Sequence, residues 1–377
     1  MGRLTIDSFA VRSSCGTNVA RRATTATWRS PIALFLILCI AACFGCSQPL
    51  RVNSYAKVDA NGNVKAQLAP TPKLTPVSAA GLPYQRHGPN STAVAIIDVD
   101  GLLLNADATG LGSWGENPVS MFRERLDAIE CDSRICAVVL RINTPGGSVT
   151  ATDIMWRDLK AFKQRTCIPV VASLMDVAAG GGYYLATGAD VVVAHPTSVV
   201  GGIGCILNVY NLQDLMAQFN ILGTPIKAGA NIDLGTPIKE LSDEKRALLQ
   251  SMADEFHVRF GNVVLKARPN VDPEEATTFD GRIFTARQAQ ELQLIDRIGY
   301  VDDAVQIAQS MAGVSCANVV FYRRRDDPAL SQYSITPNIP LQKGIIPINV
   351  PGLDRSKLPT FLYLWQMEPS TEVMLGK

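Results

Sequence analysis

The pattern of apolar and polar positions changes character near residue 93. From Ala93 on, short continuous apolar runs alternate with segments whose apolar residues recur every three or four positions. Continuous apolar runs are typical of strands buried on both faces, and their alternation with helices indicates parallel βαβ units. We therefore expect an α/β fold with a parallel sheet, followed by a more helical C-terminal part.

Helix-capping residues help to place the expected elements. Asn117 followed by Pro118 predicts a helix start, Thr150 with Asp153 predicts a capping box, and Ser242 predicts the cap of a longer helix. We expect strands at 93–99, 135–142, 169–174 and 191–194, and helices at 118–129, 150–163, 181–187, after 242 and at 285–292. In the long helix an apolar stripe should face the core; it consists of Leu249, Met252, Phe256, Phe260 and Val263.

The N-terminal segment has the features expected of an export signal. Residues 1–42 contain five arginines and one acidic residue, and end in the 12 apolar residues Pro31–Ala42. A bilayer span takes about 20 residues, so this shorter run fits the core of a secretory signal. The sequence Ile40-Ala-Ala-Cys43 resembles a bacterial lipobox and predicts lipidation of Cys43, with Cys46 as the alternative. An ordinary signal anchor with incidental cysteines is the competing interpretation.

Four segments are expected along the chain. They are a lipoprotein-type signal peptide at 1–42, an extended linker at 43–92, a main domain at 93–325 and a tail at 326–377. Within the linker, Asn61-Gly62 predicts a small hairpin between Val52 and Leu68. The prolines of Ala69–Pro76 predict a stiff spacer.

Composition argues against several classes of ligand. The 35 Lys and Arg residues balance 34 Asp and Glu residues, so no basic excess favours nucleic acid. The cysteines beyond the leader form no CxxC pair and have no histidine at metal-ligand spacing. We expect no metal site and no cofactor, and we favour free thiols over a disulfide.

Three glycine-containing segments carry the candidate chemistry. The first, Arg141–Ser148, runs from a strand through Gly146-Gly147 into a helix, and the second, Asp176–Tyr184, places three glycines at a helix start. Bare main-chain amides can hold a carbonyl oxygen as an oxyanion hole does, and a helix N-terminus favours negative charge. The third segment, His195–Gly204, follows a strand.

In this order, the three segments resemble those of protease IV, the signal peptide peptidases of the Clp protease/crotonase fold superfamily. The resemblance covers about residues 93–325 and includes Asp280–Thr285. It implies a crotonase-like fold of repeated βαβ units, a peptide ligand, ring-like oligomers and a Ser–Lys dyad that cleaves peptide bonds.

The resemblance also locates the dyad, and this chain departs from it at both positions. Gly180 stands where the family has its serine, and Ile232 where single-domain members have their lysine. Gly202 replaces a hydroxyl residue that is frequent in the third motif. Glycine has no side chain to attack a carbonyl, so we expect no intact catalytic residue. The oxyanion and peptide-binding groups expected to remain are the amides of Gly146, Gly147, Gly181 and Gly182.

Each residue that could replace a dyad member has a simpler expected role. Ser148 is expected to cap a helix, Cys205 to be a small buried hydrophobe, and Lys227 to lie on a strand. Neither histidine in this region has a visible carboxylate or thiol partner; they are His195 and His257.

The favoured interpretation is an exported protein, anchored by lipid on the periplasmic side of a bacterial cell envelope and catalytically inactive. It would bind peptides or regulate an active homologue, as a homo-oligomer or a hetero-oligomer. The alternative is an active serine-type endopeptidase that cleaves signal or membrane-associated peptides with a displaced nucleophile. An acyl-transfer enzyme of crotonase type is remote, since no coenzyme A-binding signature is present.

Overall fold

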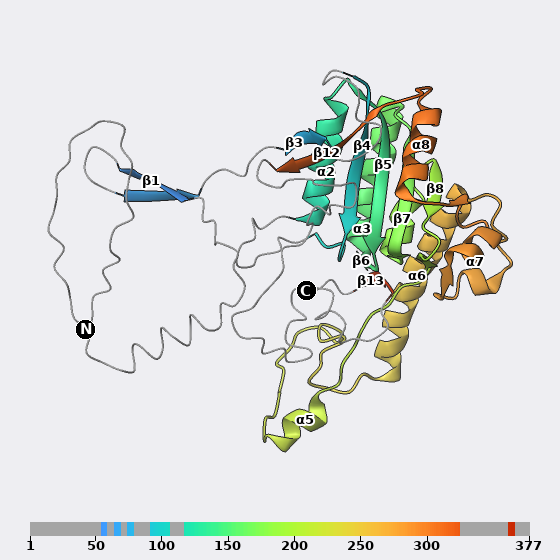
Figure 1. Cartoon of the computed structure of the whole chain (residues 1–377). Coiled ribbons are helices and arrows are strands. Elements are labelled where there is room, and N and C mark those ends of the chain that lie inside the picture. The colour runs from blue at the N-terminus through green and yellow to red at the C-terminus, as the bar shows by residue number, and fades with distance from the viewer. Residues whose placement is uncertain are drawn as a thin grey trace, which may run out of the picture. The chain divides into compact units, whose positions relative to one another are not determined.

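The computed structural model describes residues 54–58, 64–68, 74–78, 91–105, 117–324 and 361–365. The main body is built on a nine-stranded sheet (Figure 1). Its centre consists of four mutually parallel strands: β4 (Ala93–Asp100), β5 (Ile135–Thr144), β7 (Val170–Ala179) and β8 (Val191–Ala194). The expected α/β class with a largely parallel sheet is confirmed.

The sheet continues on both sides of this centre. The path is β10-β9-β7-β5-β4-β12-β3, with β8 and β11 branching from β7. The added strands are β3 (Leu74–Ser78), β9 (Val199–Gly201), β10 (Ile283–Thr285), β11 (Arg297–Ile298) and β12 (Asn318–Arg324).

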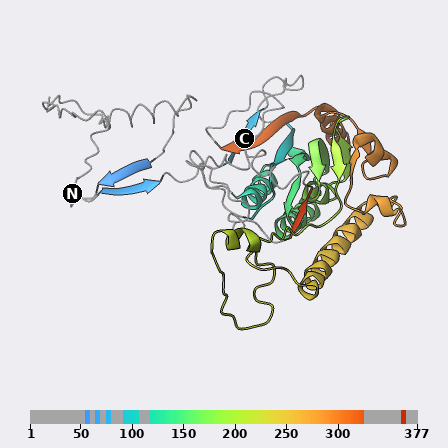
Figure 2. The same cartoon turned by 90° about the horizontal axis from the view of Figure 1, so that it is seen from below.

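Helices cover both faces of the sheet (Figures 1 and 2). On one face, α2 (Pro118–Glu130), α3 (Val149–Thr166) and α4 (Gly181–Ala186) contribute to the larger buried cluster. On the other, α8 (Val301–Met311) packs its apolar side against alternate residues of β4, β5 and β7. The remaining helices are α5 (Gln213–Gln218), α6 (Asp243–Ala267), α7 (Ala286–Glu291) and the short 3₁₀ helix Ala276–Thr278.

Of the helix starts predicted at Asn117, Thr150 and Ser242, two have the expected cap. The Asn117 side chain accepts from the first turn of α2, and the Ser242 side chain accepts from that of α6. The predicted capping box at Thr150 is wrong, because α3 already begins at Val149 and the Asp153 carboxylate instead accepts from Tyr184 and Arg259. Residues from distant parts of the chain, and not the first turn of α3, therefore bind this carboxylate.

The apolar stripe of α6 faces the core only in part. Phe260 is fully buried, whereas Met252 is 43% exposed, contrary to expectation. The N-terminal half of α6 therefore presents apolar side chains to the surface as well as to the core.

Two segments outside the expected main domain pair with it. Strand β3 pairs antiparallel with β12, so the last three residues of the expected spacer belong to an edge strand of the sheet. Strand β13 (Leu362–Leu364), in the expected tail, pairs antiparallel with β6 (Gly146–Ser148) of the first glycine motif. In Figure 2, β13 is the red strand beside the green elements.

The predictions for the residues before the main domain concern a hairpin and an export signal. Strands β1 (Ser54–Val58) and β2 (Val64–Leu68) pair antiparallel on either side of Asn61-Gly62. The expected signal peptide, Cys43 and Cys46 lie outside the described residues. Within the described ranges, no helix combines the length and apolarity that crossing a membrane requires.

Candidate functional site

The three glycine motifs meet at one edge of the sheet. Strands β5 and β7 are parallel neighbours, so the loops after Thr144 and Ala179 emerge side by side. A β-carbon built on Gly146 would lie 2.6 Å from the amide nitrogen of Gly181. Real β-carbons essentially never come this close to atoms outside their own and neighbouring residues. The third motif joins them, because the Gly180 N–H donates to the carbonyl of Gly201 at 2.9 Å.

Gly180 forms the sharp turn between β7 and α4. Its backbone angles are φ 51° and ψ −121°, in a region that glycine enters at little cost and other residues rarely adopt. A strained strand-to-helix turn of this kind is how nucleophile elbows expose a catalytic side chain. Here the turn is present and the side chain is absent.

The site contains a strand from the chain's own C-terminal region. β13 pairs with β6 on one side, where the Trp365 N–H donates to the Pro145 carbonyl at 2.9 Å. On the other side, Leu362 and Ile206 exchange both main-chain hydrogen bonds, at 2.9 and 3.0 Å. The segment 361–365 is thus an extended chain hydrogen-bonded along both edges, in a groove between the first and third motifs.

The carbonyl of Tyr363 lies between the two glycine loops. A β-carbon built on Gly180 would be 2.4 Å from the Tyr363 carbonyl oxygen and 2.7 Å from its carbonyl carbon. One built on Gly146 would overlap the same oxygen at 1.9 Å. The position where the resemblance places an attacking side chain is therefore next to a peptide carbonyl of this chain.

The expected amide donors are not equivalent. The Gly146 N–H donates to Thr144 Oγ1 at 3.0 Å in this structure, so it is engaged within its own loop. Gly147 pairs with Tyr363. Gly181 and Gly182 form the first turn of α4, where amide hydrogens have no partner within the helix.

Tyr363 is anchored by its side chain as well. The ring is fully buried, stacked on Tyr184 with centroids 5.3 Å apart and packed against Phe260 at 4.8 Å. Its hydroxyl donates to the Phe256 carbonyl of α6 at 2.7 Å. Burial raises the pKa of this phenol, which keeps the hydroxyl protonated as a donor. Sequence reasoning missed these residues; the only signal was the aromatic alternation Phe361, Tyr363, Trp365, which names no partner.

Ile232 lies on the segment between α5 and α6, and its side chain is 74% exposed. The next residue, Asp233, binds Lys227 and Lys245, each at 2.7 Å. These ammonium groups lower the pKa of the Asp233 carboxyl. Lys227 belongs to a loop rather than to the expected strand, and its charge is used in this ion-pair cluster.

The alternative nucleophiles and bases have other roles or surroundings. Ser148 occupies the N-cap position of α3, as expected, although its buried side chain makes no capping hydrogen bond. Burial raises the pKa of the half-buried Cys205 thiol to about 11, which disfavours the reactive thiolate. His257 Nε2 contacts the Phe279 carbonyl at 2.6 Å, and His195 Nδ1 contacts Thr197 Oγ1 at 2.8 Å.

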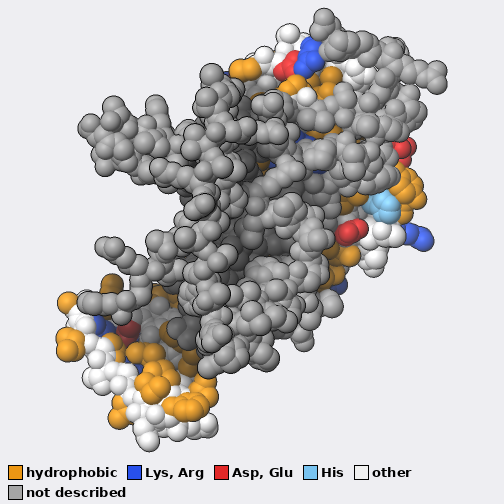
Figure 3. All heavy atoms as spheres, turned by 60° about the vertical axis from the view of Figure 1, so that its left-hand side comes forward, with side chains coloured by type: hydrophobic (Ala, Val, Ile, Leu, Met, Phe, Trp, Pro, Cys, Tyr) orange, Lys and Arg blue, Asp and Glu red, His pale blue; other side chains and the backbone are white. Residues whose placement is uncertain are grey.

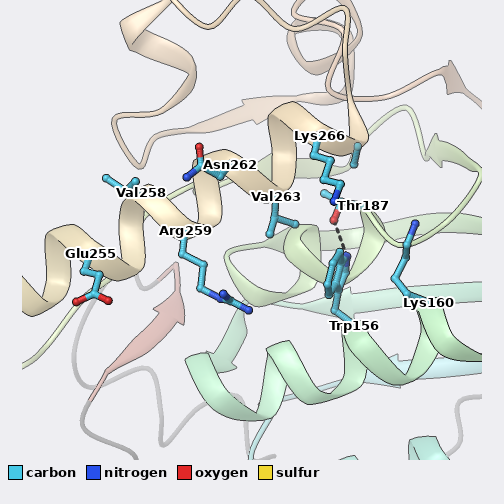
Figure 4. A pocket seen from close by; sticks show the side chains of 10 residues that line it. Trp156, Lys160, Thr187, Glu255, Val258, Arg259, Asn262, Val263 and Lys266 are labelled. Atoms are coloured by element: carbon cyan, nitrogen blue, oxygen red, sulfur yellow. Dashed lines mark hydrogen bonds between the residues drawn. The ribbon is translucent and has the colours of Figure 1, made fainter.

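A separate pocket of about 560 Å³ lies between α3 and α6 (Figure 4). Trp156 lines it and donates its indole N–H to Thr187 Oγ1 at 3.1 Å. None of the three glycine motifs lines this pocket. In the described part of the chain, no group of three or more His, Cys, Asp or Glu side chains is placed to hold a metal ion.

Comparison with known proteins assigns the family. The sequence pattern of peptidase family S49 matches residues 162–315. A putative protease of Methanocaldococcus jannaschii is 30% identical over 220 residues, which cover 58% of this chain and 70% of that protein. This chain belongs to peptidase family S49.

Another relative and a solved structure also resemble this chain. A putative signal peptide peptidase of Enterococcus faecium is 28% identical over 63% of this chain and 68% of that protein. A membrane-bound stomatin-specific protease, solved with a substrate peptide, aligns at a TM-score of 0.36 and 15% identity, over 58% of this chain and 80% of that one. A structural match this distant does not bear on the ligand of the present S49 protein.

Proposed function

We propose that this S49 protein binds extended peptides without cleaving them. The observation that carries the proposal is the segment Phe361–Trp365, which lies in the groove as an extended strand with a carbonyl against the glycine loops. Main-chain pairing of this kind is how sheet edges receive peptides, largely independently of sequence. A groove that accommodates this strand has the dimensions that another extended peptide needs.

Loss of peptidase chemistry follows from the two dyad positions. Gly180 offers no atom beyond its backbone, and the apolar side chain of Ile232 can neither take up nor return a proton. Removing a nucleophile or its base typically lowers kcat by about 10⁴- to 10⁶-fold, and the remaining acceleration comes from binding and oxyanion stabilisation.

Hydrolysis assays test this proposal with four purified chains. They are the parent, the double variant G180S/I232K, and each of these ending at Thr360. We expect neither parent form to cleave casein or a fluorogenic peptide. The truncated double variant is the form with both dyad groups and an open groove, so any gain of activity should appear there.

The competing function, an endopeptidase with a displaced nucleophile, predicts a different result. Hydrolysis by the parent chain that survives repeated purification, and that is abolished by Ser148→Ala or Cys205→Ala, would establish that function and refute ours. Labelling by a fluorophosphonate or by iodoacetamide would locate the residue.

The cellular setting is a further part of the proposal. We propose export and lipid anchoring at Cys43, or at Cys46, on the periplasmic side of the envelope, supported by the apolar run and the small residues before Cys43. Labelled palmitate should be incorporated by the parent and lost in Cys43→Ser. Loss only in Cys46→Ser would favour the alternative site, and incorporation by both single variants and by the double variant would refute lipidation here.

Assembly with further copies or with an active homologue completes the proposal. The segment around α5 exposes apolar side chains, including Phe219 at 70% and Leu222 at 85%. Figure 3 shows hydrophobic side chains gathered at the lower left of the surface. Exposed apolar patches commonly mark interfaces. Size-exclusion chromatography with light scattering should give an oligomer that the double variant F219S/L222S weakens.

A further inference from the structure

The groove makes side-chain contacts with its own strand that go beyond main-chain pairing. The Tyr363 ring is enclosed by Tyr184 and Phe260, and its hydroxyl donates to the Phe256 carbonyl at 2.7 Å. Two residues earlier, the ring of Phe361 packs edge-on against Phe256 with centroids 5.0 Å apart. Tyr363 is thus fully enclosed by aromatic side chains, an enclosure that we call the pocket, whereas Phe361 is only partly buried.

The wall of the pocket is held in place by polar contacts. The Tyr184 hydroxyl donates to Asp153 Oδ1 at 2.6 Å, and Arg259 binds the same oxygen at 2.7 Å. The Tyr184 ring also meets Trp156 edge-on at 5.8 Å. Because the Tyr184 ring is held at its hydroxyl and at its edge, the pocket has a defined shape, which favours one side chain over others of similar polarity.

The base of the pocket distinguishes tyrosine from other aromatic residues. Phenylalanine would fill the same space but would donate nothing to the Phe256 carbonyl. An alanine would leave the aromatic walls without a partner, and a phosphorylated tyrosine would bring charge into a fully buried position. Tyrosine both fills the space between the rings and donates a hydrogen bond to the carbonyl.

We propose that Phe361–Trp365 is a built-in ligand of this groove, and that the groove selects peptides with the pattern aromatic–apolar–Tyr–apolar–aromatic, which bind only after this strand has left. The inference rests on the proposed function, because it names the ligand class and the regulation of the same site. A tethered ligand acts at an effective concentration of about a millimolar, so a free peptide competes poorly while the strand is in place.

The test measures binding of a fluorescein-labelled peptide with the sequence of residues 357–366 by anisotropy. The proteins are the full chain, the chain ending at Thr360 and the full-length variant Tyr363→Ala. We expect the full chain to bind at least tenfold more weakly than the chain ending at Thr360. Equal affinities would overturn the built-in ligand.

Four altered peptides test the selectivity. Against the chain ending at Thr360, replacing the central tyrosine by phenylalanine should weaken binding about five- to tenfold, and alanine or phosphotyrosine should abolish saturable binding. Proline in place of Leu362, which removes the N–H that pairs with Ile206, should also abolish it. Equal binding of the tyrosine, phenylalanine and alanine peptides would overturn the tyrosine pocket.

The variant Tyr363→Ala covers the case in which the shortened chain does not fold. In it, amide hydrogens of Ile206 and Trp365 should exchange faster with deuterium, and peptide binding should become measurable. Unchanged protection together with no binding would overturn the inference.

Two further measurements separate the remaining outcomes. Sedimentation of the full chain mixed with the chain ending at Thr360 should show no complex that depends on residues 361–365; such a complex would mean that the strand serves a second copy, against our proposal. Hydrolysis of the labelled peptide by the parent or by its shortened form would refute the proposed function. Equal affinities of these two chains for the peptide, without hydrolysis, would refute this inference alone.

Discussion

At the scale of single residues, Gly180 combines a positive φ with a carbonyl group next to the place of a side chain. Both features should destabilise the variant Gly180→Ser. A non-glycine residue in this region costs about 1–3 kcal/mol of stability. The added β-carbon would also meet the Tyr363 carbonyl oxygen at 2.4 Å.

We therefore expect Gly180→Ser to lower Tm more than Gly313→Ser does. Gly313 has a φ of 69° and would place its β-carbon in open space, so this control carries backbone strain without the overlap. In chains ending at Thr360 the difference between the two variants should shrink. Thermal unfolding of the four proteins checks this, and equal Tm losses in the full-length pair would contradict the overlap.

Cys205 gives a second prediction at this scale, from its raised pKa. With a pKa of about 11, only about one thiol in 10³ is ionised at pH 8, so iodoacetamide should react with Cys205 at least a hundredfold more slowly than with Cys131. The rate should rise about tenfold per pH unit toward pH 11, because the thiolate is the reacting form. Mass spectrometry with the exposed Cys131 and Cys167 as internal controls measures it; similar rates at pH 8 would contradict the burial.

At the scale of elements, an ion pair joins two central strands. Asp98 of β4 and Arg141 of β5 are paired in register, and the carboxylate accepts from the guanidinium at 2.7 Å with both side chains almost fully buried. Arg141 also lies over the Phe321 ring of β12, 5.5 Å from its centroid. The pair therefore connects the three neighbouring strands.

Asp98→Ala should lower the free energy of unfolding by about 3–5 kcal/mol, because it removes a carboxylate to which a buried guanidinium donates. Glu291→Ala, which breaks the exposed pair with Arg287 on α7, should cost less than about 1 kcal/mol. Urea denaturation of both variants measures the difference. A cost for Asp98→Ala as small as that for Glu291→Ala would contradict the role of the buried pair.

At the scale of the whole molecule, the sheet ends at a strand from far away in the sequence. β3 covers β12 through main-chain pairing, and its Pro76 is tolerated because an edge strand need not donate along its outer side. Without β3, the edge of β12 would present unpaired N–H and C=O groups to other molecules.

A chain beginning at residue 70 should unfold at the same temperature as one beginning at residue 47. A chain beginning at residue 82 should have a lower Tm and should aggregate at concentrations where the other two remain monodisperse. Calorimetry and light scattering test this. Identical behaviour of all three chains would mean that β3 does not protect the sheet edge.

The sequence by itself determined the α/β class and most elements of the body. Largely apolar runs such as Ala93–Val99 are typical of central strands buried on both faces, and local caps such as Asn117 and Ser242 need only their own helix. The glycine motifs were also readable, because close approach of two loops requires the absence of side chains. The resemblance alone locates the expected dyad positions, so the residues that stand there, Gly180 and Ile232, can be named without any structure.

Only the tertiary structure decided what lies in the groove. The segment Phe361–Trp365 joins β6 through main-chain groups that every sequence possesses, across more than 200 residues, so no local pattern specified the pairing. The same reason hid the pairing of β3 with β12, and the use of Asp153 by Tyr184 and Arg259 instead of by its own helix. Local interactions are encoded where they act, whereas pairing between distant strands depends on the folded backbone that brings them together.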